Sequence, residues 1–592
     1  MYQHKQRYPK SRRRFSKPSE TPPLKPGADA GLKKIFATIG IPRSRPFVPD
    51  AFQTRAVAVI EHADCLVTVP TGAGKTWIAE QAIARIHEKD GRSWYACPLK
   101  ALSNAKFAEF SDIFGIKNVG ILTGDRKENP DAPIIVGTTE ILRNQLYDAM
   151  CRGQSLATDL VVLDEAHFLG DEDRGVVWEE IMIYLPARIP LLMLSATIGN
   201  GRQIAAWLSS VRNKRCAVIE ETIRPVPLFP LFFHPTGTLL PLTTSDNADV
   251  RPQLYKKVKQ YIKTRRPRNF EHYRNLPPFG DILRVLKRYD LLPAIFFLKS
   301  RADCDAALNS CRGNRPLAPG HLQRLNREIA AYIQHTPHIA THRQRWHLEN
   351  LAVGAHHSGQ LPSWKLILER LMTAGLLDAV FATSTVAAGV NFPARTVVFF
   401  NSDRFNGKHF MPLTPTEFHQ MTGRAGRRGM DKIGFALVVP GKFMDVRSMV
   451  KLLSRPPSDV ISQIRINFSM VLNLLLSHNP DQIEELLRKS FANYIIIRSK
   501  QKKGVSDGHK YLWQNFLRHL TFLKSTGFVT AENELTRDGQ WASQLRVDQP
   551  LLIAEGFRRG VFQQSDPDML AAVIASFVNE REVDGRINKK FV

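Results

Sequence analysis

The sequence lacks paired cysteines, long apolar runs and an excess of acidic side chains. Its six cysteines are scattered over 592 residues without a C-x-x-C pair, which argues against a zinc knuckle or a disulfide framework and favours reduced thiols. No apolar run approaches the roughly 18 residues needed to cross a bilayer, and the basic N-terminus has no apolar segment typical of a secretion signal. We therefore expect a cytoplasmic protein that is neither secreted nor inserted in a membrane.

The shortage of acidic residues leaves a strong positive charge. There are 82 lysines and arginines against 55 aspartates and glutamates, a formal net charge of +27. Clustered positive charge favours a polyanionic partner, because binding releases the counterions of a nucleic acid. A basic surface that serves only solubility is the alternative. The length is too great for one hydrophobic core and indicates about three to five domains.

Short apolar runs alternate with amphipathic helical patterns in two blocks, residues 47–225 and 281–445. The first contains CLVTV, SWYAC, PIIVG, LVVLD and LLMLS, and the second contains PAIFFL, LAVGAHH, DAVFATS, TVVFFN and GFALVV. Near-continuous apolar strands with helices between them are typical of a parallel sheet that is covered on both faces. The sequence thus predicts an α/β fold with two parallel-sheet domains in tandem.

The segments around these blocks have different compositions. Residues 1–46 are rich in lysine, arginine and proline, and we predict a mostly disordered basic tail. Residues 226–280 are predicted to be a linker with a basic insertion, whose aromatics among lysines and arginines suit backbone binding and base stacking. A surface insertion without that role is equally compatible with the pattern.

Beyond residue 445 the pattern becomes helical. FSMVLNLLLS and DQIEELLRKSFANYI carry apolar residues at helical spacing. The following stretch predicts a helix, a strand, a turn at Glu532 and Asn533, a second strand, and a helix capped by Thr536. We interpret residues 446–535 as a winged-helix region and residues 536–592 as the beginning of a C-terminal helical domain.

The stretch PTGAGKT, Pro70 to Thr76, follows an apolar strand and precedes an amphipathic helix, as a P-loop requires. Backbone N–H groups around Gly72, Ala73 and Gly74 can surround phosphates at the helix N-terminus. Lys75 would reach the β- and γ-phosphates, and the Thr76 hydroxyl would bind Mg²⁺. The predicted cofactors are therefore ATP and Mg²⁺, bound by the loop from Thr71 onward.

Two further strands end in polar residues suited to the same chemistry. VVLDEAH ends in Asp164, placed to hold Mg²⁺, and Glu165, placed to orient and deprotonate the attacking water. LSAT, Leu194 to Thr197, supplies hydroxyls that can hydrogen-bond to this acidic pair. His167 is compatible with an ordinary core histidine.

The order of these motifs resembles the superfamily-two DExH helicases, and most closely the superkiller and exosome-associated RNA helicases and their bacterial HelY relatives. Other matching stretches are PLKALSNAKF, TGDRKENPDAPIIVGTTEILRNQLY, DRGVVWEE, RPVPL, HHSGQLP, FATSTVAAGVNFPARTVVF, QMTGRAGRRG and FSMVLNLL. The resemblance implies two RecA-like domains, a winged helix and ATP-dependent 3′ to 5′ movement along RNA. It also implies partners in RNA degradation or processing, and we expect a monomer.

The resemblance assigns roles to individual positions. Phe47 would stack on adenine, Gln53 would read the adenine edge, and Gly389 and Asn391 would face the nucleotide. Contacts to nucleic-acid phosphates would come from Lys100, Ser103, Asn104, Thr139 and Arg143 in the first domain and from His357, Ser358 and Thr383 in the second. Such contacts follow a backbone and predict binding without sequence preference.

The stretch QMTGRAGRRGM, Gln420 to Met430, would face the P-loop across the cleft between the domains. Arg424 and Arg427 are predicted to act on the γ-phosphate as arginine fingers, and Gln420 to hydrogen-bond near the attacking water. Arg428 has two open interpretations, a nucleic-acid contact or an ion pair between the domains.

An Asn406–Gly407 turn predicts a β-hairpin. In related helicases a hairpin here resembles a wedge that parts the duplex, with Phe405 and Lys408 as contacts; a hairpin that only packs is the alternative. The sequence departs from the resemblance in two places: it has no large arch inserted in the winged-helix region, and we expect only the start of the C-terminal helical domain.

Three other functions remain open or weakly supported. A DNA helicase acting in repair or recombination is compatible, because backbone contacts distinguish RNA from DNA only where a 2′-hydroxyl is engaged. An ATP-regulated clamp that never opens a duplex would use the same ATP motifs. A nuclease has little support, because no further carboxylate or histidine cluster shows a metal-binding pattern.

Overall fold

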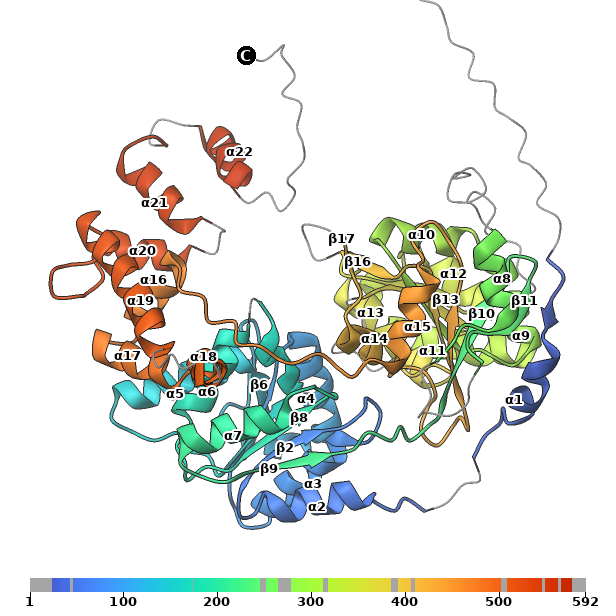
Figure 1. Cartoon of the computed structure of the whole chain (residues 1–592), viewed down its shortest axis with the longest axis horizontal. Coiled ribbons are helices and arrows are strands. Elements are labelled where there is room, and N and C mark those ends of the chain that lie inside the picture. The colour runs from blue at the N-terminus through green and yellow to red at the C-terminus, as the bar shows by residue number, and fades with distance from the viewer. Residues whose placement is uncertain are drawn as a thin grey trace, which may run out of the picture.

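The computed structural model describes residues 24–42, 46–172, 174–244, 252–264, 278–311, 318–384, 392–405, 410–501, 508–545, 549–562 and 566–577. Two α/β domains lie side by side, and a helical region lies beside the first of them (Figure 1). Each α/β domain contains an eight-stranded sheet. No helix among the described residues is long and apolar enough to span a membrane.

The first domain is built on a sheet with the strand order β5-β4-β6-β3-β7-β8-β2-β9, in which only the edge strand β5 is antiparallel to its neighbour. Every residue of its five central strands is buried, as expected of a parallel sheet covered on both faces. The strands are β2 (Asp64–Thr68), β3 (Ser93–Cys97), β4 (Val119–Leu122), β5 (Lys127–Glu128), β6 (Ile134–Thr138), β7 (Leu160–Asp164), β8 (Leu191–Ser195) and β9 (Cys216–Glu220). The helices are α2 (Ala51–Val59), α3 (Lys75–His87), α4 (Lys100–Phe114), α5 (Thr139–Cys151), α6 (Gly175–Tyr184) and α7 (Gly201–Arg212).

The second domain repeats this architecture with the order β1-β11-β10-β18-β15-β12-β14-β13, in which β10 and β11 are antiparallel. The strands are β1 (Gly27–Ala28), β10 (Leu228–Phe233), β11 (Thr238–Pro241), β12 (Ala294–Leu298), β13 (Val353–His356), β14 (Ala379–Thr383), β15 (Thr396–Phe399) and β18 (Gly434–Val438). The helices are α1 (Lys33–Ala37), α8 (Lys256–Thr264), α9 (Phe279–Arg288), α10 (Arg301–Asn309), α11 (Pro319–His335), α12 (Arg345–Leu351), α13 (Pro362–Thr373), α14 (Pro415–Thr422) and α15 (Val446–Ser454). The predicted α/β class with two RecA-like sheets is confirmed.

Two predicted boundaries are wrong. The disordered tail was expected through residue 46, but β1 pairs in parallel with β11, and the Leu32 side chain is fully buried in the second core. The linker was expected at residues 226–280, but β10 and β11 in that range are strands of the second sheet. The second domain therefore contains residues from both sides of the first domain in the chain. The tail boundary was missed because a two-residue edge strand is too short to show in a compositional pattern.

The helical region begins after α15 and packs on the first domain. Its helices are α16 (Phe468–Leu475), α17 (Pro480–Lys489), α18 (Phe491–Gln501), α19 (Gly508–Ser525), α20 (Arg537–Gln544), α21 (Pro550–Arg558) and α22 (Pro567–Phe577). The predicted cap is confirmed, since the Thr536 side chain accepts a hydrogen bond from the Gly539 N–H. Between α19 and α20 a single antiparallel bridge joins Val529 to Leu535, with Asn533 at a φ of 71° in the turn. The assignment of the whole region as a winged helix stays a prediction.

Polar contacts fix the helical region to the first domain. Asn200 donates to the Val460 carbonyl and accepts from the Val460 N–H, both at 2.8 Å. The Trp207 indole donates to the Lys489 carbonyl at 2.8 Å. Glu179 of α6 is fully buried at this junction and accepts hydrogen bonds from Ser462 and from the Phe491 N–H. The first domain and the start of the helical region therefore share one core.

The buried Glu179 makes the stability of this junction depend on pH. Burial raises the pKa of Glu179 from 4.5 to about 7, although its two hydrogen bonds act in the opposite direction. The folded protein thus holds the proton of the Glu179 carboxyl more tightly than the unfolded chain does. Its contribution to the free energy of unfolding is complete below about pH 4.5 and is lost as pH rises to about 7. Such a shift corresponds to roughly 3 kcal/mol.

We expect Glu179→Gln to raise the free energy of unfolding by roughly 1–3 kcal/mol at pH 8 and to leave it unchanged at pH 4, where wild type is already protonated. The amide can still accept from Phe491 N–H and donate to Ser462. Urea unfolding at the two pH values measures the difference, with exposed Glu88→Gln as the control. An equal effect at both pH values would show that the charge of Glu179 is unimportant.

Candidate ATP site and nucleic-acid interface

A cavity of about 490 Å³ lies between the two α/β domains. From the first domain it is lined by the P-loop, by part of α4 and by the acidic pair that ends β7. From the second domain it is lined by residues of α13 and by the segment after α14 that carries the arginines. Parallel strands present their carboxyl ends at one edge of each sheet, which brings these separate motifs together.

The P-loop has the geometry of a phosphate cradle. Gly72 and Gly74 have φ values of 81° and 90°, which non-glycine residues rarely adopt. A Cβ at Gly72 would meet no atom within 4 Å, so the loop leaves open space at this point. Lys75 and Thr76 form the first turn of α3, where N–H groups and the helix dipole favour an anion. The loop thus fits the phosphates of a nucleotide.

Gln53 and Arg428 support the P-loop from outside. The buried Gln53 side chain donates to the Gly74 carbonyl at 2.9 Å and accepts from the Asp50 N–H at 2.7 Å. Arg428 donates to the Ala73 carbonyl and to the Asp50 carboxylate, both at 2.8 Å. Of the two interpretations of Arg428, the ion pair between the domains is therefore the one observed. Gln53 holds the loop here, and its contact with adenine stays a prediction.

The acidic pair is held rigidly at the end of β7. Asp164 accepts a hydrogen bond of 2.6 Å from the Tyr95 hydroxyl and one of 2.9 Å from the Glu165 N–H. Glu165 has a φ of 60°, a conformation that typically costs a non-glycine residue about 1–3 kcal/mol. Burial and the neighbouring negative charge of Glu165 raise the pKa of Asp164. A divalent cation or the Lys75 ammonium would relieve the repulsion between the two carboxylates. The Thr76 hydroxyl and the Asp164 carboxylate are oxygen donors of the kind that Mg²⁺ prefers, so they fit this metal.

His167 joins the acidic pair to the second domain, although the sequence alone suggested only a core residue. Its Nδ1 lies 3.4 Å from the Glu165 carboxylate, and its Nε2 is 2.8 Å from the Gln420 amide of α14. Burial lowers the pKa of His167, and the negative charge of Glu165 acts in the opposite direction. Burial acts to raise the pKa of Glu165, but the charges of His167, Lys75 and Arg424 outweigh it and lower that pKa. Glu165 is therefore ionised and in position to accept a proton.

The two predicted arginine fingers differ in their surroundings. Arg424 is half-buried, and burial lowers its pKa against the favourable charge of Glu165. Arg427 forms two hydrogen bonds to the Asp431 carboxylate, at 2.8 and 3.0 Å. Asp431 also accepts from Arg395 at 2.8 Å. Both arginines line the cavity, and Arg424 is the one whose charge acts on the Glu165 carboxylate.

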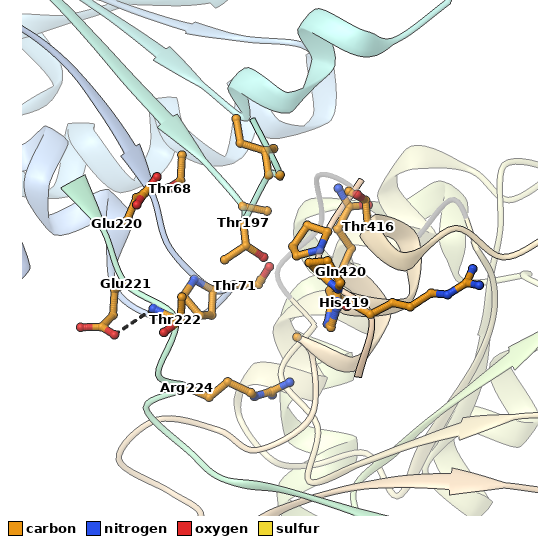
Figure 2. A pocket seen from close by; sticks show the side chains of 18 of the residues that line it. Thr68, Thr71, Thr197, Glu220, Glu221, Thr222, Arg224, Thr416, His419 and Gln420 are labelled. Carbon is orange, nitrogen blue, oxygen red and sulfur yellow. Dashed lines mark hydrogen bonds between the residues drawn. The ribbon is translucent and has the colours of Figure 1, made fainter. Parts of the chain in front are cut away.

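A second cavity of about 530 Å³ adjoins the first and shares Thr71 and Gly423 with it. Figure 2 shows Thr416, His419 and Gln420 of the second domain facing Thr71 and Thr197 of the first across this space. Arg224, from the connection between the domains, donates to the carbonyls of Thr422 and Ala425 at 3.0 and 2.8 Å. Burial lowers the pKa of Arg224 to about 10. The connection thus holds the C-terminal end of the helix that presents Gln420.

Three predicted nucleotide contacts, Phe47, Gly389 and Asn391, stay predictions. Phe47 is 59% exposed with its ring centroid 5.8 Å from that of Trp77, so it is available to stack on a base. Gly389 and Asn391 lie outside the described residues. No group of three or more His, Cys, Asp or Glu side chains that could hold a metal is present in the described part of the chain.

Five of the predicted nucleic-acid contacts have accessible or partly accessible side chains. Lys100 is exposed and pairs with Asp125 at 3.2 Å, while Asn104 accepts from Arg126 at 2.7 Å. Arg143 pairs with Glu180 at 3.4 Å. In the second domain Ser358 is exposed and Thr383 is half-buried. A phosphate contact by these residues stays a prediction, and Arg126, which the sequence reasoning missed, belongs to the same exposed surface.

Three predicted contacts are not supported, because their side chains are buried. Ser103 donates to the Gly137 carbonyl and is 0% exposed, and Thr139 is equally buried. His357 is 3% exposed and lies 3.5 Å from Asp305 and 3.0 Å from the Gln360 amide. These residues shape the strand ends and loops that carry their exposed neighbours.

The hairpin is confirmed, but its predicted two-residue turn is wrong. β16 (Asp403–Phe405) pairs antiparallel with β17 (Phe410–Pro412), and Phe405 lies opposite Phe410. An Asn406–Gly407 turn of two residues would have placed Phe405 opposite Lys408. Residues 406–409, including Lys408, lie outside the described residues. The Lys299 ammonium lies 3.6 Å from the ring centroid of Phe410, the residue that begins β17.

Comparison with known proteins identifies two families. Residues 50–204 match the DEAD/DEAH box helicase family, and residues 532–590 match the DSHCT (NUC185) domain. The chain is 37% identical over 502 residues to "Probable helicase HelY" of Mycobacterium tuberculosis, covering 79% of this chain and 54% of that protein. It is 34% identical over 534 residues to "Superkiller complex protein 2" of Homo sapiens, covering 86% and 42%. It is also 34% identical over 497 residues to "Exosome RNA helicase MTR4" of Mus musculus, covering 80% and 45%. The chain spans about half the length of these curated relatives.

Proposed function

Because the chain belongs to the DEAD/DEAH box helicases, we propose that it is an ATP- and Mg²⁺-dependent helicase that moves 3′ to 5′ along single-stranded RNA. The observation that carries the proposal is the cavity in which P-loop, acidic pair and arginines from two domains converge. RNA is favoured over DNA because two of the relatives are a superkiller complex protein and an exosome RNA helicase. We infer that RNA-degrading or RNA-processing proteins are its partners.

The residues of the cavity divide the chemistry among them. Mg²⁺, when bound at Thr76 and Asp164, would neutralise charge on the β- and γ-phosphates. Glu165 accepts the proton of the attacking water, and His167, whose Nδ1 lies 3.4 Å from the carboxylate, keeps it oriented. Lys75 and Arg424 stabilise the negative charge that develops on the transferred phosphoryl group.

Interdomain contacts connect this chemistry to movement. Gln420 reaches His167 from α14, and Arg428 reaches Asp50 and the P-loop, so both contacts cross the cleft. Nucleotide binding favours the closed arrangement of the two domains, and hydrolysis removes the γ-phosphate that the arginines hold. If the two domains bind the RNA backbone with different affinities in the open and the closed arrangement, alternating closure and opening moves the protein along the RNA in one direction.

Nucleic-acid-stimulated ATP turnover tests the proposed substrate. We expect single-stranded RNA to raise kcat by at least about tenfold, and a DNA strand of the same sequence to raise it much less. The measurement is steady-state phosphate release with matched strands at fixed ionic strength, since phosphate contacts make the affinity salt-dependent. Stimulation by DNA alone would overturn the RNA assignment and favour a DNA helicase.

A further inference from the structure

Lys106 of α4 is a buried cation inside the candidate ATP site to which neither the motifs nor the comparisons assign a role. Lys106 is 8% exposed, and its ammonium donates to the Thr76 hydroxyl at 2.8 Å and to the Glu109 carboxylate at 2.7 Å. It lines the same cavity as Lys75, Asp164 and the arginines. A buried lysine is costly unless its charge is paired, so the position of this ammonium calls for an electrostatic explanation.

The surroundings of Lys106 are rich in negative charge. Burial raises the pKa of Asp164, and the charge of Lys106 opposes this rise. Burial and the charge of Glu109 also raise the pKa of Glu80, one turn after Thr76 on α3, and Lys106 again acts in the opposite direction. Lys106 is thus the cation that α4 contributes to the acidic side of the P-loop helix.

Lys106 and a bound metal ion would compete for the same oxygen. Mg²⁺ requires oxygen ligands at about 2.0–2.1 Å in nearly octahedral geometry. An ammonium that already donates to the Thr76 hydroxyl occupies one of its lone pairs and repels a divalent cation placed beside it. Glu109 offers the ammonium a second partner on the same helix, and its side chain is 42% exposed.

We propose that Lys106 is a built-in counter-cation that holds the Thr76 hydroxyl in the metal-free protein and yields it to Mg²⁺ when Mg²⁺–ATP binds. The proposal rests on the proposed ATP site. The ammonium then pairs with Glu109 alone, so that Lys106 and Glu109 together set the Mg²⁺ concentration at which nucleotide is bound. Lys106 is a positioning residue, because it acts on Thr76 and not on the reacting atoms.

Equilibrium binding of ATP, measured by calorimetry in EDTA and across a Mg²⁺ titration, tests this competition. Lys106→Met should lower the half-saturating Mg²⁺ concentration by about tenfold, since the charged hydrogen bond that competes with the metal for the Thr76 hydroxyl is lost. Glu109→Gln should shift the half-saturating Mg²⁺ concentration upward, because the ammonium then depends on Thr76 alone. The exposed Lys89→Met serves as the control.

The opposite signs of the two shifts separate competition from a structural role. Glu109→Gln changes a partly exposed side chain and so tests the same competition without emptying a buried position. Unchanged Mg²⁺ dependence in Glu109→Gln, or shifts of the same sign in both variants, would overturn the role of Lys106 while leaving the proposed function intact. Failure of the wild type to bind ATP at any Mg²⁺ concentration would overturn both.

Discussion

Glu165→Gln is expected to lower ATP turnover by at least about 100-fold, the usual contribution of a positioned general base. Glutamine has nearly the same shape, so the left-handed backbone at this position and the contact with His167 remain. The variant loses only the ability to accept a proton from the attacking water. ATP binding should stay within a few-fold of wild type, and steady-state turnover combined with calorimetric binding measures both quantities.

The control for this prediction is Glu140→Gln, which alters an acidic residue of the first domain outside the cavity and should leave turnover unchanged. If Glu165→Gln retained most of its turnover, another group would have to be the base. If it lost ATP binding as well, the carboxylate would have a structural role in the cleft instead of a chemical one.

The second large effect is expected at Arg424. Replacing this arginine with alanine should lower kcat by roughly 10³-fold, the lower end of the range for arginine fingers. The reason is its position: Arg424 lies in the cavity, and its charge acts on the Glu165 carboxylate. Single-turnover hydrolysis with saturating ATP measures the loss, and strand binding measured by fluorescence anisotropy should be largely preserved.

Two neighbouring arginines provide matched comparisons for Arg424. Arg427→Ala should also reduce hydrolysis sharply, and Asp431 would keep its pairing with Arg395 in that variant. Arg428→Ala should mainly raise the KM for ATP, because it removes the contacts to Asp50 and the Ala73 carbonyl. Equal loss of hydrolysis and strand binding in Arg424→Ala would show that this segment clamps nucleic acid.

The central strands of both sheets could be predicted because buried parallel strands leave a direct mark in the sequence. SWYAC and LVVLD coincide with β3 and β7 as observed. The N-terminal segment could not be predicted in this way. Leu32 is a buried residue within a segment rich in lysine, arginine and proline, and its place depends on the pairing of β1 with β11, a strand that begins only at Thr238.

The chemical motifs were predicted more reliably than the contacts around them. P-loop, acidic pair and arginines meet in one cavity, as their order along the chain indicated. The burial of Ser103, Thr139 and His357 could not be predicted, because a motif gives residue types but not the direction of a side chain. The role of His167 as a bridge to Gln420 depends on how the two domains meet, which only the structure shows.

The burial of Lys106, a residue to which no motif assigns a role, could not be predicted either. Its contact with Thr76 joins two helices, α3 and α4, that are separated in the chain by β3. A lysine on an amphipathic helix is ordinarily read as a solvated residue. Its burial at the P-loop therefore became visible only when the packing of the two helices was known.

Strand displacement on a 3′-tailed RNA duplex tests the proposed helicase activity most directly. We expect wild-type protein to release the labelled strand when ATP and Mg²⁺ are present and to leave a 5′-tailed duplex closed. Glu165→Gln should bind the substrate without releasing the strand. RNA-stimulated ATP turnover without displacement of the strand would contradict helicase activity and would identify the protein as an ATP-regulated clamp.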